Sequence, residues 1–242
     1  MPGLPTLPPT SHSLHRARPQ PAASIHAVWV ASALGGLGQS LAGAAGGLLA
    51  QQVASDSVAG MPQALLVAGA ALSALLLSRL TVTRGRRIAL TTGASVAVLG
   101  CLVVVIGAVL ASLWLILGGS LLLGAGNTAV MLGRYAAADL LPETARVRAM
   151  ATVLVATTVG AVAGPNLLAP ASNVATQLGL PALSGPYFGA SIGFAAAAAT
   201  LALGLRAAPS QPPRESTGRT GFGSGQRRTG RRQRTRWRAE RR

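Results

Sequence analysis

Long uncharged stretches alternate with short arginine-bearing segments along most of the chain. An apolar block occupies 27–50, and the uncharged intervals between charged residues run over 57–78, 88–133 and 149–205. These three intervals contain 22, 46 and 57 residues. A helix that crosses the hydrocarbon core of a bilayer needs about 20 mostly apolar residues. The first two stretches are therefore each long enough for one membrane span, and the last two are each long enough for two.

The expected fold is an all-α membrane protein with six transmembrane helices between two disordered tails. Strands are disfavoured because Ala and Gly, which are abundant in these stretches, are poor strand residues. Backbone in lipid must also form helices or a closed barrel. The helices are expected at 27–50, 58–80, 88–110, 113–135, 149–169 and 185–205, with a tight turn near Ala111 and Ser112 and a polar connection over 170–186. The Pro-rich arm 1–26 and the Arg-rich tail 206–242 are predicted to be disordered.

The positive charge of the chain is unevenly placed. All 21 basic residues are arginine, and the formal net charge is +16. The tail 206–242 holds twelve arginines and two acidic residues, so it carries +10 and the rest of the chain carries +6. A pI near 12 would indicate a nucleic-acid partner for a soluble domain. Because most of this charge lies in a tail, nucleic acid is not the expected partner.

The arginines outside the tail lie on alternate connections. Two precede the first predicted span, four lie within 79–87, and three lie within 134–148. The three intervening connections carry only Asp56. Since arginine accumulates on the cytoplasmic side of a membrane, both termini are expected in the cytoplasm. Arginine without lysine, together with abundant Ala and Gly, favours a bacterial source, so the predicted location is the bacterial inner (plasma) membrane, with the lipid bilayer as a partner.

The sequence disfavours an enzyme. It has no Gly-rich phosphate loop after a strand, no nucleophile elbow, and no cluster of His, Cys and carboxylate residues. Its single cysteine, Cys101, lies in an apolar run and implies neither a disulfide framework nor a metal cluster. We therefore expect no catalytic residue, no metal and no cofactor.

Polar side chains at membrane depth are expensive and often functional. Apart from Arg79 and Arg134, which fall at the ends of predicted spans, no Asp, Glu, Lys or Arg lies inside a predicted span. The candidates for a substrate pathway are Gln39, Asn127 and Asn166. For Gln39 and Asn127, a hydrogen bond between helices competes with contact to a substrate. For Asn166, beside a Gly-Pro step, a structural role is favoured. Proton coupling usually needs a titratable group, and these spans supply none.

The fifth predicted span carries Gly160-x-x-x-Gly164 followed by Pro165. Glycines spaced by four residues let helices approach closely in lipid. The Gly-Pro step frees backbone carbonyls one turn earlier and allows a bend. In a bundle such a bend is tolerated because neighbouring helices satisfy the freed groups. The motif therefore predicts a bent helix buried against a partner helix.

Three local patterns resemble the major facilitator superfamily over about 27–205. The segment GAVAGP resembles the fifth-helix motif best known in the proton-coupled antiporters of that family. The segment 79–87 lies where the family carries its signature between helices 2 and 3, and 134–151 resembles its loop between helices 4 and 5. The matching residues are Gly160, Gly164 and Pro165 in the fifth helix, Leu80, Gly85, Arg86 and Arg87 in the first loop, and Arg134, Asp139 and Arg148 in the second.

The chain also departs from the family pattern. The family's loop aspartate and the arginine that follows it are replaced by Val82 and Thr83, which puts a cytoplasmic latch between two halves in doubt. Two glycines expected after the Gly-Pro step are Leu168 and Ala169, which weakens an antiporter assignment. The family uses twelve helices in two related halves, whereas six spans are predicted here. A truncated or frame-shifted product is favoured; pairing with a second half-transporter or with itself, and a six-helix protein outside the family, remain open.

The resemblance implies alternating-access transport of a small solute by a secondary transporter, with export favoured over uptake and proton coupling left open. The alternative is a non-transporting six-helix scaffold or partner subunit whose basic tail binds anionic lipid or nucleic acid. The sequence identifies neither the substrate, the coupling ion nor the direction of transport.

Overall fold

The computed structural model describes residues 22–139 and 143–205. The arm before residue 22 and the tail after residue 205 lie outside the described residues, so the predictions about them stay untested. The described chain forms six long helices within one compact unit. They are α1 (Ala22–Val53), α2 (Met61–Arg84), α3 (Arg86–Val109), α4 (Leu113–Asp139), α5 (Arg146–Gln177) and α6 (Ser184–Gly204), with short 3₁₀ turns at Asp56–Val58 and Glu143–Ala145. The prediction of an all-α protein with six helices is confirmed.

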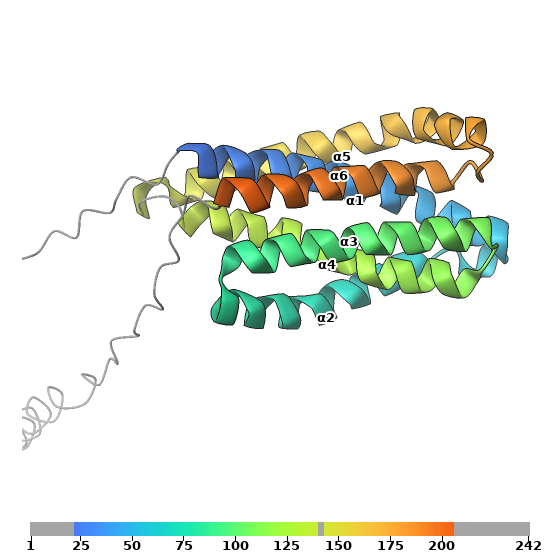
Figure 1. Cartoon of the computed structure of the whole chain (residues 1–242), viewed down its shortest axis with the longest axis horizontal. Helices are drawn as coiled ribbons and strands as arrows, with labels where there is room; N and C mark the ends of the chain where they lie inside the picture. Colours follow the sequence, from blue (N-terminus) through green and yellow to red (C-terminus); the bar gives the residue numbers. More distant parts are fainter. Residues whose placement is uncertain (1–21, 140–142, 206–242) are drawn as a thin grey trace, which may run out of the picture. The chain divides into compact units, whose positions relative to one another are not determined.

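The helices pack as two groups of three. In one group α1 lies between α5 and α6, and in the other α4 lies between α2 and α3 (Figure 1). Contacts of α3 with α6, and of α4 with α1 and α5, join the groups. Successive helices run in opposite directions, so the connections fall alternately at two ends of the bundle. One end, which we call the arginine end, holds the α2–α3 connection and the segments carrying Arg134, Arg146 and Arg148.

Short connections keep sequential helices close. A single residue, Gly85, separates α2 from α3; its φ of 89° lies where side chains are disfavoured, and its N–H donates to Thr81 O at 3.1 Å. The turn expected near Ala111 and Ser112 lies between α3 and α4, and Ala111 has a φ of 48°. Gly179, with a φ of 74°, follows the end of α5.

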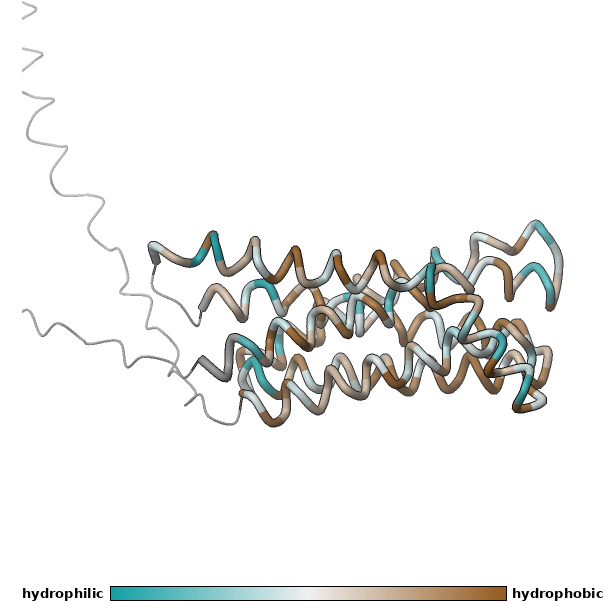
Figure 2. Tube along the Cα trace, turned by 90° about the horizontal axis from the view of Figure 1, so that it is seen from above, coloured by the Kyte–Doolittle hydropathy of each residue, from teal (hydrophilic) through white to brown (hydrophobic). Residues whose placement is uncertain are grey.

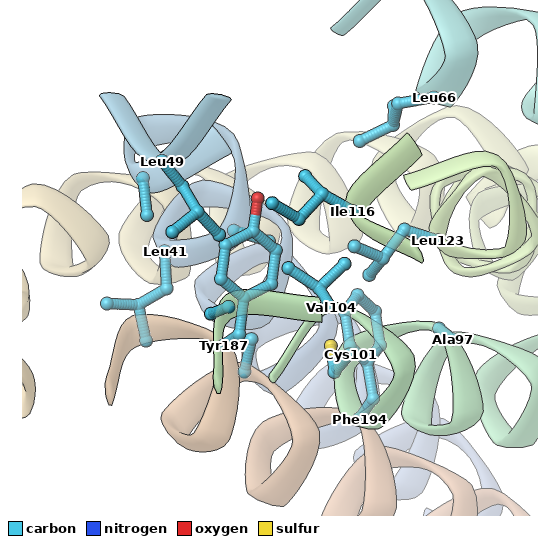
Figure 3. Packing of buried hydrophobic residues seen from close by; sticks show 14 residues of the cluster. Leu41, Leu49, Leu66, Ala97, Cys101, Val104, Ile116, Leu123, Tyr187 and Phe194 are labelled. Carbon is cyan, nitrogen blue, oxygen red and sulfur yellow. The ribbon is translucent and has the colours of Figure 1, made fainter. Parts of the chain in front are cut away.

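The interior is built from small residues around a few large ones. Tyr187 and Phe194 of α6 are almost fully buried, and they pack with Cys101 and Val104 of α3 and with Leu49 of α1 (Figure 3). Between α3 and α4 the backbones approach closely, since a Cβ placed on Gly100 would lie 2.8 Å from Gly119 O. Close approach of this kind drives helix association in lipid, where burying apolar groups gains little.

Five helical segments of the described chain are long and apolar enough to cross a membrane, namely Asp56–Arg84, Arg86–Val109, Leu113–Ala138, Arg146–Gln177 and Ser184–Gly204. Hydrophilic residues gather mostly near the ends of the bundle (Figure 2). Helix α1 has 32 residues, but its six glycines and Gln39 lower its mean hydropathy, so it is not among the five.

Two boundaries differ from the sequence-based expectation. Helix α1 begins at Ala22, inside the arm that was expected to be disordered through residue 26. Helix α5 continues through Pro170 to Gln177, whereas a connection was expected over 170–186. A proline removes one backbone donor, and in a bundle the surrounding groups can compensate for that loss. The connection between α5 and α6 is therefore only 178–183.

Candidate functional site

Helices α1 and α5 meet at glycines. A Cβ on Gly36 would lie 2.5 Å from Thr157 O, and one on Gly160 would overlap the backbone oxygen of Ala33. Gly164 faces Ser40, whose side chain leaves no room for a Cβ. Glycine is thus required on both sides of this contact because backbone lies against backbone.

The Gly-Pro step of α5 is satisfied from α1. In a regular helix the N–H of residue 165 would donate to Ala161 O, but Pro165 has no N–H. The hydroxyl of Ser40 donates to Ala161 O instead, at 2.7 Å. One residue on, Asn166 Nδ2 donates to Val162 O at 2.9 Å. Asn166 is exposed on α5, and this amide N–H is used by its own helix.

We expect Ser40→Ala to lower the stability of the bundle by about 1 kcal/mol, because Ala161 O would lose its donor. The thiol of Cys101, the only cysteine of the chain, is fully buried, so its reaction with a thiol-reactive dye on heating reports unfolding. Pro165→Ala restores the backbone N–H and serves as the matched background. An equal loss of stability from Ser40→Ala with and without Pro165 would contradict this assignment.

Gln39 places an unsatisfied polar atom inside the bundle. It lies one helical turn after Gly35 and Gly36, which face Val130 of α4 and Thr157 of α5. Gln39 is half-buried, and its Oε1 is enclosed with no hydrogen-bond partner among the described residues. An enclosed acceptor without a donor costs about 1–3 kcal/mol. The described part of the chain therefore supplies no donor to this atom.

Asn127 lies at the same depth as Gln39. Val130 of α4 faces Gly35 of α1, and the two helices run in opposite directions. From this contact, Gln39 lies four residues forward along α1, which is about 6 Å at about 1.5 Å per residue. Asn127 lies three residues back along α4, which is about 4.5 Å. Both steps lead away from the arginine end. Asn127 is half-buried, and the described residues give its side chain no hydrogen bond.

The three predicted pathway residues thus separate into a pair and a single residue. Gln39 and Asn127 share the side of the bundle where α1 meets α4, whereas Asn166 lies on the exposed surface of α5. The pair presents two uncommitted carboxamides, which can donate and accept hydrogen bonds. This arrangement can bind a polar group but offers no proton carrier.

The loop residues lie at the arginine end. Leu80, Arg86 and Arg87 are half-buried around Gly85. Arg134 is half-buried, and its Nε is enclosed without a hydrogen-bond partner in the described chain. Arg148 is exposed, and the side chain of Asp139 lies outside the described residues. The predicted role of this second loop in tying helix ends together stays a prediction.

Sequence-based reasoning did not identify Ser40 as the donor to the Gly-Pro step. Ser40 lies four residues from the small residues Gly36 and Ala44 within 27–50, but the register of this row against 149–169 could not be read from the sequence. It also did not identify a cavity of about 200 Å³ among α2, α3 and α4. Among the described residues, no three of His, Cys, Asp or Glu gather as a metal site would require.

Comparisons with known proteins point to one family. The profile described as Major Facilitator Superfamily matches residues 28–241. The MFS-type transporter YdeG of Bacillus subtilis (strain 168) is 35% identical over 187 residues, which are 77% of this chain and 44% of that protein. The MFS-type transporter YddS of the same organism is 38% identical over 176 residues, which are 72% of this chain and 40% of that protein. The chain thus spans less than half the length of either relative.

Proposed function

Because this chain belongs to the major facilitator superfamily, we propose that it is a six-helix unit of a secondary transporter that moves a small polar solute by alternating access. The protein is a membrane protein and therefore contacts the lipid bilayer. The family consists of transporters rather than enzymes, as the sequence predicted. The observation that carries the proposal is the enclosed, unpartnered Oε1 of Gln39 at the depth of Asn127.

The chemistry of this pair indicates the class of solute. Gln39 Oε1 needs an N–H or O–H donor, and the carboxamide of Asn127 can donate or accept. Neither group is charged, and the described spans between the helix ends carry no Asp, Glu, Lys or Arg near them. A neutral solute with hydroxyl or amide groups meets both requirements. A solute that carries full charge would need a counter-ion from elsewhere.

A second six-helix unit is the proposed partner, either a separate chain or a second copy. Only 17% of the 18-residue apolar stretch of α2 and 22% of that of α5 is buried, compared with 61% for α4. Their exposed side chains include Leu72, Leu75, Val155 and Val162. These two helices flank the α1–α4 contact, because α5 packs on α1 and α2 packs on α4. A unit seated across them would cover Gln39 and Asn127 and close a site between two halves.

The arginine end is proposed to face the cytoplasm of a bacterial inner membrane. It gathers the arginines of both described Arg-bearing connections, and the other end carries Asp56. This distribution follows the positive-inside rule. The fifth-helix motif favours export. If transport is coupled to protons, the partner unit must supply the carboxylate, since the described spans offer none.

Reconstitution into proteoliposomes tests the proposed function. We expect little or no flux from the chain alone, and flux of neutral polar solutes in preference to charged ones when a complementary six-helix unit is co-reconstituted. A panel of radiolabelled amino acids, polyols, nucleosides and amines provides the probes, and empty vesicles provide the control. Robust flux of one solute through the monomeric chain would contradict the need for a second unit; no flux from any assembly across the panel would contradict transport.

A further inference from the structure

A cavity of about 200 Å³ opens at the arginine end, away from Gln39 and Asn127. Its wall comes from three helices, with two residues from each of α2, α3 and α4. They are Ser78 and Thr81, Arg86 and Leu90, and Leu132 and Tyr135. The transport proposal gives this cavity no role.

Along the bundle axis, the cavity has a polar layer at its mouth and a mostly apolar layer below it. Thr81, Arg86 and Tyr135 lie nearest the helix ends, and each has a partner about one turn deeper on the same helix. The deeper layer contains Leu90, which is buried, Leu132, which is half-buried, and the exposed Ser78, whose hydroxyl donates to Leu75 O of its own helix. A ligand that fits both layers has a polar head toward the helix ends and an apolar part toward the membrane centre.

The outer layer selects an anion. Arg86 is half-buried and carries five N–H donors, so it can bind a ligand in addition to the interaction it already makes. The hydroxyl of Tyr135 is a second donor, whereas that of Thr81 donates to Leu77 O of its own helix. Arg79, Arg84 and Arg87 lie within two helical turns on the same two helices. Guanidinium groups bind phosphate strongly, often through two parallel hydrogen bonds.

We propose that this cavity binds the phosphate of an anionic phospholipid. Arg86 and Tyr135 donate to the phosphate oxygens, and the first methylenes of an acyl chain lie against Leu132 and Leu90. A lipid is favoured over a soluble phosphate because the cavity combines an apolar deeper layer with a polar mouth at the level where helices leave the membrane. A phosphatidylcholine headgroup is disfavoured because its trimethylammonium would lie among arginines.

Titration with short-chain lipids tests the site. The full chain in an uncharged maltoside detergent is titrated calorimetrically with dihexanoyl phosphatidylglycerol, dihexanoyl phosphatidylcholine and inorganic phosphate. We expect Arg86→Gln to weaken phosphatidylglycerol binding about tenfold, and Tyr135→Phe about threefold. The matched control is Arg79→Gln, which removes the same charge from an exposed position of α2 outside the cavity and should change affinity less than about twofold.

The titrations separate the outcomes. Tighter binding of phosphatidylglycerol than of inorganic phosphate, lost in Arg86→Gln, supports the lipid site. Equal binding of inorganic phosphate at the same site supports the anion cavity and identifies soluble phosphate as its ligand. Equal losses in Arg79→Gln and Arg86→Gln, or no preference over phosphatidylcholine, overturn the proposal. If Arg86→Gln does not fold, Tyr135→Phe distinguishes the same outcomes, and the titration needs no transport.

Discussion

Replacing Gly160 by alanine is expected to separate α1 from α5 and to destabilise the bundle by about 3 kcal/mol. The new methyl would overlap Ala33 O and lie 2.8 Å from Leu37 N, and both atoms belong to the backbone of α1. A backbone cannot swing aside as a flexible side chain can, so the helices must move apart. Overpacking commonly costs about 1–3 kcal/mol, and a backbone contact belongs at the upper end. The contact between α1 and α5 is one of the two largest in the bundle, so the loss spreads over much of the interface.

The matched control is Gly43→Ala in α1. A Cβ on Gly43 meets no atom within 4 Å, so the same chemical change is made on the other helix of the pair without a clash. Alanine is also a better helix former than glycine by about 1 kcal/mol, so this variant should be as stable as the parent or more stable. Dye labelling of Cys101 during heating compares the three proteins. A similar melting temperature for Gly160→Ala and Gly43→Ala would show that the glycine contact is not required.

The sequence predicted the six helices because charged residues mark the ends of membrane spans. A charged side chain in the hydrocarbon core costs several kcal/mol, so the arginines mark where each pair of helices must end. The tight turn at Ala111 and Ser112 follows from dividing 46 uncharged residues between two spans. The end of α5 could not be predicted from the placement of charges. Pro170 predicts a break in an isolated helix, but the helix persists to Gln177 inside a bundle.

The candidate site was predicted only in part. Gln39 and Asn127 were identifiable as polar residues in apolar spans, but their common depth depends on the register between α1 and α4. That register is set by Gly35 against Val130, a contact between positions 95 residues apart. The cavity beside Arg86 needs three helix ends to converge, so no local motif indicates it. Local rules predict elements, whereas sites between helices depend on contacts that are distant in sequence.

Replacing Gln39 by methionine is expected to stabilise the isolated chain and to abolish most of its transport activity in the assembled transporter. Methionine has a similar length and flexibility but no hydrogen-bonding oxygen. It therefore removes an enclosed acceptor without a partner, and relief of this penalty should raise stability by about 1 kcal/mol. A solute donor that bonded Gln39 would meet an apolar thioether instead. The KM for that solute should rise by about ten- to a hundredfold.

The opposite signs of these two effects distinguish a solute contact from a bond between helices. If Gln39 held helices together, methionine would lower the melting temperature, and flux would fall only as folded protein was lost. Thr200→Val is the matched control, because the Thr200 hydroxyl donates to Ala197 O of its own helix α6, which lies outside the proposed contact with the second unit. This substitution removes a polar group from a span and is expected to change the melting temperature and the KM only slightly. Loss of stability in Gln39→Met with an unchanged KM per folded molecule would assign Gln39 to packing, and the substrate site would then have to be sought elsewhere.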